Sequence, residues 1–292
     1  MNNILKLLKN ISGSDSGVVE SRLPGVRIFK ETKPISCRPM LYNPGICIIA
    51  SGHKIGHLAG QSFRYDADNY LVTSVAMPFE TEAHPDENEP LLGLFIDIDM
   101  AQLADMISQM NLQAEVVKVT ENDLPLGVGP SVMNEEMRDA VAKLLTALQS
   151  EMETKILAPG FVREIYYRAL CGEQAPVLYS LAKGSVSLSQ VARVIKMMEV
   201  DYHQKLDVEY LAETANMSVS AFHKAFKEIT ADSPLQYLKK IRLTHARELM
   251  TQQKMKAYLA ADKVGYESPS QFSREFKRYF GMNPAEVLRE MR

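Results

Sequence analysis

The sequence of 292 residues has no long run of apolar residues. No window approaches the roughly 18 consecutive apolar residues that a membrane-spanning helix needs. The first ten residues, MNNILKLLKN, are too short and too polar for a secretory signal peptide. These absences exclude a protein built around transmembrane helices, and we expect a cytoplasmic protein with no membrane partner.

Cysteine is scarce as well, with only Cys37, Cys47 and Cys171. Their number is odd, and their spacing matches no common metal-binding motif. A chain without an export signal remains where thiols are kept reduced. We therefore expect no structural disulfide.

A strong charge of one sign is also lacking, because the net charge is only −3. Residues 1–184 contain 16 Lys and Arg against 23 Asp and Glu, whereas residues 185–292 contain 17 against 13. The small positive excess at the C-terminal end suits an anionic partner, but by itself it does not indicate nucleic acid.

The structural signals along the chain predict two domains. From Arg22 to Val119, short apolar runs are separated by glycines and polar turn residues, as in a small β-barrel or sandwich; the runs are Ile46–Ala50, Tyr70–Met77 and Leu91–Asp99. From about residue 185 onward the pattern is helical throughout. A segment mixing Pro, Gly and Ser places the boundary near residues 183–187, so we predict domains 1–184 and 185–292.

Three helices are predicted before this boundary. Asp99 can cap a helix through Gln109, residues 134–152 have the spacing of an amphipathic helix, and residues 161–171 form a third helix closed by Gly172. The apolar stripe from Met137 to Leu148 either packs within the chain or forms a dimer contact.

The C-terminal region repeats itself at an offset of 50 residues. MSVSAFHKAFKEITADSPLQYL, residues 217–238, aligns with ESPSQFSREFKRYFGMNPAEVL, residues 267–288, in its serines, phenylalanines, basic residues and proline. Such self-similarity predicts two copies of one supersecondary unit.

The first copy has the parts of a helix-turn-helix unit. Asp207 caps one helix, residues 216–217 form the turn, and Ser218 caps a second helix that buries Phe222 and Phe226.

The second copy repeats this plan. A helix from Met255 to Lys263 is followed by a turn at Gly265, and Ser268 caps the next helix. Pro269 takes the first helical position, and Gln271 has capping-box spacing from Ser268.

The second helix of each unit suits the DNA major groove, whose width admits one α-helix. The edge opposite its phenylalanines carries small polar and cationic groups that can reach bases, and Arg274 is the strongest because a guanidinium contacts guanine bidentately. The predicted base-contacting residues are Ser220, His223, Lys224, Ser270, Ser273 and Arg274. The predicted phosphate contacts are Ser218, Lys227, Ser268, Lys277 and Arg278.

A long helix from Pro234 to about Met250 is predicted between the two units. As a rigid connector it would place the two recognition helices in successive major grooves, about 34 Å apart on one face of double-stranded promoter or operator DNA.

The C-terminal third of the chain resembles the AraC/XylS family of bacterial transcription regulators. The resemblance rests on S-x-x-x-F-x-K-x-F-K in the first unit, SPLQYLKKIRLTHARELM between the units and VGYESPSQFSREFKRYFGMNP in the second. It implies base contacts from the six positions named above. Ala231 departs from the glycine that usually ends the first recognition helix, at a cost of about 1 kcal/mol if its φ is positive.

The resemblance extends to the N-terminal domain. Residues 22–99, including LPGVRIF, MLYNPGICIIASGHK, FRYDADNYLVTSVAMP and PLLGLFIDID, are similar to an AraC subfamily whose cupin-like barrel senses a small effector. The implied fold is α+β: a cupin-like β-barrel with flanking helices, then an all-α domain with two helix-turn-helix units. The family also implies contact with RNA polymerase and allows a homodimer, and it leaves open the effector, the operator and whether the protein activates or represses.

Candidate effector or sensor residues in the N-terminal domain are Cys37, Cys47, Phe63, Tyr65 and Tyr70. Arg38 beside Cys37 is expected to lower the thiol pKa, and the two cysteines would form a redox or electrophile sensor if the barrel brings them together. The alternative is that Cys47 is a small buried residue and that the aromatic residues are ordinary core.

His53 and His57, in HKIGH, raise a metal-dependent cupin enzyme with a helical appendage as an alternative function. On an extended strand, however, residues i and i+4 lie about 13 Å apart. We therefore predict no metal site, no cofactor and no catalytic residue. A further alternative, an architectural DNA-binding protein, would bind scrambled DNA as well as specific DNA.

Overall fold

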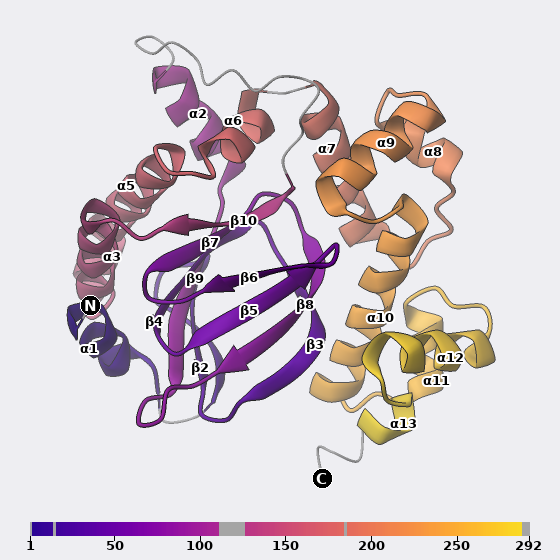
Figure 1. Ribbon diagram of the computed structural model, residues 1–292, viewed down its shortest axis with the longest axis horizontal. Coiled ribbons are helices and arrows are strands. Elements are labelled where there is room, and N and C mark those ends of the chain that lie inside the picture. The colour runs from indigo at the N-terminus through magenta and orange to yellow at the C-terminus, as the bar shows by residue number, and fades with distance from the viewer. Residues whose placement is uncertain (1, 14–15, 111–125, 184–185, 288–292) are drawn as a thin grey trace.

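The computed structural model describes residues 2–13, 16–110, 126–183 and 186–287. Its N-terminal part holds two β-sheets with flanking helices, and its C-terminal part is helical (Figure 1). The predicted domain boundary falls at residues 184–185, and the last part of the predicted strand-rich segment falls at 111–119; both lie outside the described residues.

Two antiparallel sheets face each other in the N-terminal part, which we call the β domain. One has the strand order β1-β2-β9-β4-β7-β10, and the other has the order β3-β8-β5-β6. In the described part of the chain, no hydrogen-bonded strand pair joins the two sheets. The predicted cupin-like fold is confirmed, in the form of two facing sheets. The strands are β1 (Gly17–Glu20), β2 (Val26–Glu31), β3 (Ile35–Tyr42), β4 (Gly45–Ser51), β5 (His53–Leu58), β6 (Gln61–Tyr65), β7 (Asn69–Thr73), β8 (Met77–His84), β9 (Leu91–Asp97) and β10 (Val128–Val132).

The predicted strands at 46–50 and 91–99 correspond to β4 and β9. The predicted strand at 70–77 is wrong in its extent, because β7 ends at Thr73 and β8 begins at Met77. Since Ser74, Val75 and Ala76 are all buried, the apolar pattern continues across the break and conceals it.

The centre of the six-stranded sheet is buried on both faces. In β4, Ile46 and Ile48 pack against the flanking helices, whereas Cys47 and Ile49 point between the two sheets. This alternation follows from the period of two in a strand.

Helices α1 to α6 flank the β domain (Figure 1). They are α1 (Asn2–Ile11), α2 (Met100–Met110), α3 (Glu135–Ala147), α4 (Glu151–Ile156), α5 (Ala158–Leu170) and α6 (Ala175–Lys183). The backbone amides of Ala101 and Gln102 donate to Asp99 Oδ1, which confirms the predicted cap of α2. The predicted helix over 134–152 is instead two helices, because α3 ends at Ala147 and Ser150 caps α4.

The apolar stripe of α3 packs within the chain. Met137, Val141, Leu144, Leu145 and Leu148 are all buried in the core between the helices and the six-stranded sheet. Of the two alternatives for this stripe, intramolecular packing is therefore the one that the structure adopts.

The helical domain contains α7 to α13. They are α7 (Val186–Asp201), α8 (Val208–Thr214), α9 (Val219–Thr230), α10 (Pro234–Gln252), α11 (Ala257–Lys263), α12 (Pro269–Phe280) and α13 (Pro284–Val287). The predicted connector is α10, which runs between the two helix pairs (Figure 1). Among the described residues, no helix is long and apolar enough to cross a membrane.

The β domain and the first helix pair share one apolar core. Met77 and Phe79 of β8 belong to the same buried cluster as Phe222 and Phe226 of α9. Two hydrogen bonds cross this junction: Tyr237 Oη donates to Ala76 O at 2.6 Å, and Gly127 N donates to Ile229 O at 3.0 Å. The second helix pair has a separate core around Phe272 and Phe276.

The C-cap of α9 gives a testable consequence for stability. Ala231 has a φ of 62°, in the left-handed region where a side chain is strained and glycine is not. We expect Ala231→Gly to raise the free energy of unfolding by about 0.5 to 1 kcal/mol. Chemical denaturation measures this change.

The matched control is Ala221→Gly, at an exposed position inside the same helix. There glycine should lower the free energy of unfolding by about 1 kcal/mol. Destabilisation by both substitutions would contradict strain at Ala231.

Candidate nucleic-acid interface

Helices α8 and α9 form the first helix-turn-helix unit, with the predicted caps. Asp207 Oδ1 accepts a hydrogen bond from Tyr210 N at 2.9 Å, and Ser218 Oγ accepts one from Ala221 N at 3.3 Å. Asn216 takes a φ of 52° in the turn, a conformation that asparagine tolerates. Both helix starts are therefore set by local side-chain hydrogen bonds.

Helices α11 and α12 form the second unit. Gly265 has a φ of 84°, and a Cβ there would lie 2.4 Å from His203 O, so the turn requires glycine. Ser268 Oγ accepts from Gln271 N at 3.3 Å, and Pro269 occupies the first turn. The predicted capping box is only half formed, because Gln271 Nε2 donates to Glu275 Oε1.

The two recognition helices, α9 and α12, are anchored by equivalent aromatic residues. Phe222 and Phe226 of α9, like Phe272 and Phe276 of α12, are buried, with ring centroids 5.4 Å apart within each pair. The repeated spacing thus seats each helix by one edge and leaves the opposite edge exposed.

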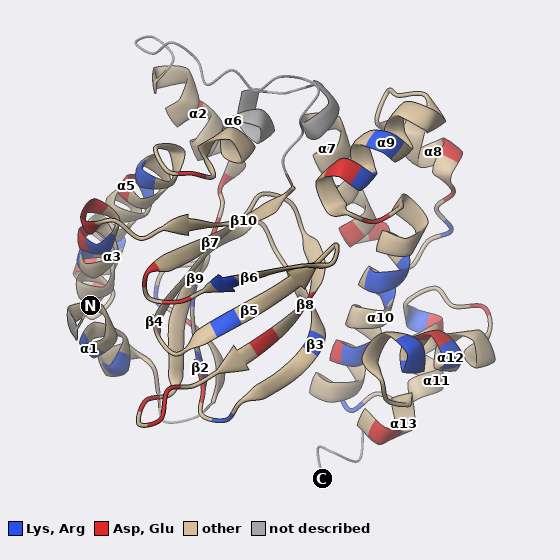
Figure 2. Ribbon diagram, in the orientation of Figure 1, with Lys and Arg blue, Asp and Glu red and all other residues tan. Residues whose placement is uncertain are grey.

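All six predicted base-contacting residues lie on these exposed edges: Ser220, His223 and Lys224 on α9, and Ser270, Ser273 and Arg274 on α12. The predicted phosphate-contacting residues Ser218, Lys227, Lys277 and Arg278 are exposed, and Ser268 is partly exposed. Basic residues lie on α9, α10 and α12 (Figure 2). Lys224 forms a long ion pair with Glu228, 3.9 Å between Nζ and Oε1, which is weak at such an exposed position.

Polar contacts hold α12 against α10. Glu275 accepts a hydrogen bond from Tyr266 Oη at 2.8 Å and forms an ion pair with Lys239 at 3.0 Å. Its carboxylate is well shielded from solvent, and the contacts with Lys239 and Tyr266 outweigh burial, so the pKa of Glu275 is lowered. Arg242 of α10 in turn donates to the carbonyl oxygens of Tyr202 and Gln204.

A cavity of about 650 Å³ lies between the β domain and α7. This volume is within the range of small-molecule sites. The lining from the β domain and the start of α2 is Asn43, Pro44, Ser74, Val75, Ala76, Asp97, Ile98 and Met100; the lining from α7 is Ser189, Ala192, Arg193, Ile195, Lys196 and Glu199.

Glu199 is the unusual group in this cavity. Its Oε1 atom is buried and has no hydrogen-bond partner in the structure. Burial raises the pKa of Glu199 to about 7, although the charges of His245 and Lys196 act in the opposite direction. The carboxyl group therefore changes protonation near neutral pH.

The predicted sensor residues lie elsewhere, and none of them lines this cavity. Phe63 and Tyr65 pack between the sheets, where Tyr65 Oη lies 2.8 Å from Tyr42 Oη. Tyr70 faces the flanking helices instead. Cys47 is fully buried between the sheets, whereas Cys37 is exposed, and both are free thiols.

The prediction that Arg38 lowers the thiol pKa of Cys37 is wrong. Partial burial and the carboxylates of Glu80 and Glu82 raise the pKa of Cys37. The charge of Arg38 acts instead on Glu31, because neighbouring residues of a strand point to opposite faces.

His53 and His57 make different contacts. The ring of His53 stacks on His84, with centroids 4.8 Å apart, whereas His57 Nε2 lies 2.8 Å from Glu82 Oε1. Sequence reasoning missed Glu82 and Glu199 because the contacts of both depend on partners from other elements. Glu199 stands next to the apolar residues MM in the sequence, whereas Glu82 is one of several acidic residues in ETEAHPDENEP and gives no separate signal.

Comparison with known proteins gives two family matches. Residues 22–177 match the profile of the AraC-type transcriptional regulator N-terminus, and residues 211–290 match a helix-turn-helix domain. The first match alone covers more than half of the chain.

Relatives and solved structures agree with these matches. A lactose operon transcription activator of Staphylococcus xylosus is 21% identical over 239 residues, which cover 82% of this chain and 81% of that protein. The RCS-specific HTH-type transcriptional activator RclR of Escherichia coli is 34% identical over 101 residues, and the match covers only 35% of either chain. The structure of Vibrio cholerae ToxT with a bound unsaturated fatty acid has a TM-score of 0.60 at 12% identity, covering 90% of this chain and 93% of that one.

The likeness to ToxT shows that the β domain and the two helix-turn-helix units occur together in one known fold. With a β domain that matches the family profile and a duplicated unit of the expected type, the chain belongs to the family of AraC-type transcriptional regulators.

Proposed function

We propose that this protein binds specific promoter or operator DNA through α9 and α12 and regulates transcription in response to a small effector. The observation that carries the proposal is the duplicated recognition unit, in which two buried aromatic edges present two exposed edges of serine, histidine and cationic side chains. In this proposal the domain of residues 1–184 senses the effector and the domain of residues 185–292 binds DNA. No catalytic step is required.

The connector supports simultaneous insertion of both recognition helices. Helix α10 has 19 residues and is therefore about 28 Å long. One turn of DNA separates successive major grooves on one face by about 34 Å. A single continuous helix of this length can thus hold the two units at nearly the required separation.

The proposed contacts differ in what they contribute. Arg274 is long enough for bidentate contact with a guanine, and Ser270 and Ser273 flank it on α12. Lys227, Lys277 and Arg278, with the helix N-termini capped by Ser218 and Ser268, suit phosphate groups and fix the register.

The effector site that we propose is the cavity between the β domain and α7. A molecule bound there contacts both domains at once, so it favours any arrangement of the domains that fits it better. The ToxT structure named above contains a fatty acid. In this chain the carboxyl group of Glu199 is among the lining, which favours a small effector with a hydroxyl or amine donor.

At a promoter the regulator would act on RNA polymerase, and a homodimer would double the number of recognition helices on the DNA. Footprinting with polymerase and light scattering of the purified chain test these two parts of the proposal separately.

The test of sequence-specific binding uses DNA selected from a random library by the purified protein. At one fixed salt concentration, the protein should bind the selected DNA at least about 10³-fold more tightly than a scrambled sequence. Equal affinity for both would identify an architectural DNA-binding protein instead.

Arg274→Ala is the sharpest test of the recognition surface. We expect a loss of about 1 to 3 kcal/mol in binding free energy, confined largely to one base pair of the site, because a bidentate contact reads one guanine. The residue is exposed, so its removal should leave the fold intact. Binding to a set of single-base variants of the selected DNA measures the loss.

The control is Lys155→Ala, which removes one positive charge from an exposed position on α4. It should leave both affinity and base preference unchanged. Uniform weakening by Arg274→Ala across all sequences would assign Arg274 to phosphate, and no change would remove it from the interface.

Glu199 makes stability depend on pH in a defined direction. Its pKa is about 7 in the folded chain and about 4.5 when unfolded, so the folded state binds more protons between these values. The free energy of unfolding should therefore fall as pH rises from about 5 to 7, by at most about 1.4 kcal/mol for each unit of pH. Glu199→Gln should flatten this part of the profile.

Urea denaturation at a series of pH values measures the profile, with Glu209→Gln on the exposed surface of α8 as the control. A profile that Glu199→Gln leaves unchanged would show that Glu199 is not desolvated in the cavity. A compound that raises the melting temperature of the wild type and the Glu209 variant but not of Glu199→Leu would identify an effector of the proposed site.

A further inference from the structure

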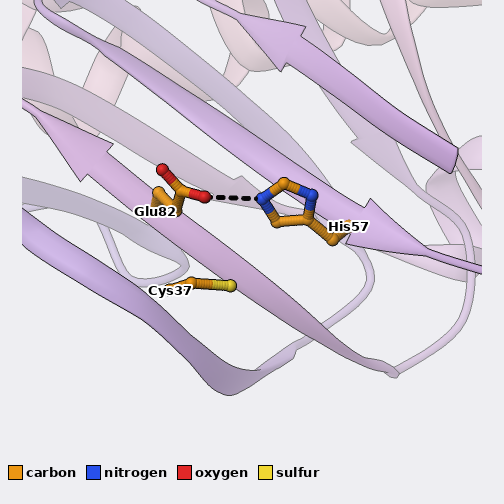
Figure 3. Close-up of side chains that lie close together, drawn as sticks. All are labelled: Cys37, His57 and Glu82. Carbon is orange, nitrogen blue, oxygen red and sulfur yellow. Dashed lines mark hydrogen bonds and ion pairs between the residues drawn. The ribbon is translucent and has the colours of Figure 1, made fainter. Parts of the chain in front are cut away.

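Three side chains of types that can bind a metal ion lie together on the outer face of the four-stranded sheet. Cys37 is on β3, Glu82 is on β8 and His57 is on β5, and these three strands are neighbours in the order β3-β8-β5 (Figure 3). Their ligand atoms, the thiol sulfur, a carboxylate oxygen and an imidazole nitrogen, all lie within 4.8 Å of one another.

A β-bulge helps to bring Cys37 into the group. Between Ile35 and Arg38, the register of β3 against β8 shifts, so that β3 has one residue more than its partner. Such a bulge bends the strand and redirects side chains. Cys37 Sγ consequently lies 3.8 Å from Glu80 Oε2, on the face that also carries Glu82.

Hydrogen bonds on both sides orient the other two ligands. His57 Nδ1 lies 2.8 Å from Ser62 Oγ, which directs Nε2 toward Glu82. The second carboxylate oxygen of Glu82 lies 3.0 Å from His84 Nε2. Partners of this kind, which fix the imidazole and carboxylate from outside, accompany metal ligands in proteins.

We propose that Cys37, His57 and Glu82 bind a divalent first-row transition ion of the Zn²⁺ type. Thiolate, imidazole and carboxylate are the three side-chain ligands of zinc, at about 2.0 to 2.3 Å from the ion. Ligands at those bond lengths lie about 3 to 4 Å apart in a tetrahedral site, so Cys37 needs to move by only about 1 Å. Three protein ligands leave the fourth position for water.

Binding requires a defined change of protonation. The Cys37 thiol loses its proton to solvent, and the His57 proton resides on Nδ1, where it is donated to Ser62 Oγ while Nε2 binds the ion. The carboxylate of Glu82 exchanges its hydrogen bond to His57 for the metal.

This site is separate from the effector cavity and does not depend on DNA binding. None of the three ligands lines the cavity beside α7. They also lie on the opposite side of the sheet from Leu58 and Phe79, which face the core between the sheets. An ion held here joins three strands of the sheet from outside.

The test is a titration of the tag-free full chain with Co²⁺ after treatment with a chelator, followed by displacement with Zn²⁺. We expect one Co²⁺ per chain and a thiolate-to-cobalt charge-transfer absorption in the near ultraviolet. Cys37→Ser should abolish this absorption, and His57→Gln and Glu82→Gln should each lower the Zn²⁺ affinity at least tenfold.

Cys171→Ser, at the other exposed cysteine, is the matched control and should retain both the absorption and the affinity. Circular dichroism of the metal-free variants checks that each remains folded. The proposal is overturned if Co²⁺ does not bind stoichiometrically, if the absorption persists in Cys37→Ser, or if His57→Gln and Glu82→Gln bind Zn²⁺ as tightly as the wild type.

Discussion

The rest of the structure depends on the apolar core that the β domain shares with the first helix-turn-helix unit. Phe222, Phe226 and Tyr237 are completely buried in a cluster that continues between the two sheets. Burial of each such side chain contributes about 1.5 to 3 kcal/mol. The hydrogen bonds Tyr237–Ala76 and Gly127–Ile229 join the two parts at defined positions, because hydrogen bonds are directional and apolar packing is not. The orientation of α9 is therefore fixed by the β domain as much as by its own unit.

The second unit is attached differently. It has its own core, and α10 joins it to the first unit. The buried side chains of α10 contribute to both cores, with Ile241 in one and Leu249 in the other. The Lys239–Glu275 ion pair then fixes α12 on the side of α10. A change in the β domain thus reaches α9 through the shared core, and it reaches α12 both through α10 and through the direct contact of α12 with β3.

What the sequence predicts correctly is mostly local. The starts of α9 and α12 follow from Ser218 and Ser268, because a cap needs only a serine and an amide three residues later. The recognition edges follow in turn from the helical period and the repeated phenylalanines. The sequence does not show the break between α3 and α4, because the apolar spacing continues through it.

What the sequence does not predict depends on contacts across the fold. The cavity joins Ser74 and Glu199, which are far apart in the chain, and the pKa of Glu199 reflects that packing. In the sequence, the charged neighbour of the Cys37 thiol is Arg38, but the sheet places the thiol beside Glu80 and Glu82. Likewise, Tyr65 and Tyr70 are both candidate effector residues in the sequence, but the strands turn them toward different cores.

In the proposed effector mechanism, Glu199 lies where a small molecule would contact both domains. A buried polar atom without a partner costs about 1 to 3 kcal/mol, and Glu199 Oε1 is such an atom at the junction between the domains. Under the proposed function, an effector that opens access to this carboxyl group and donates a hydrogen bond to it would remove that cost, and only while both domains line the cavity. Coupling free energies of 1 to 3 kcal/mol correspond to about 5- to 150-fold changes in affinity. One satisfied hydrogen bond at this junction would therefore be large enough to couple the binding of the proposed effector to the affinity for DNA.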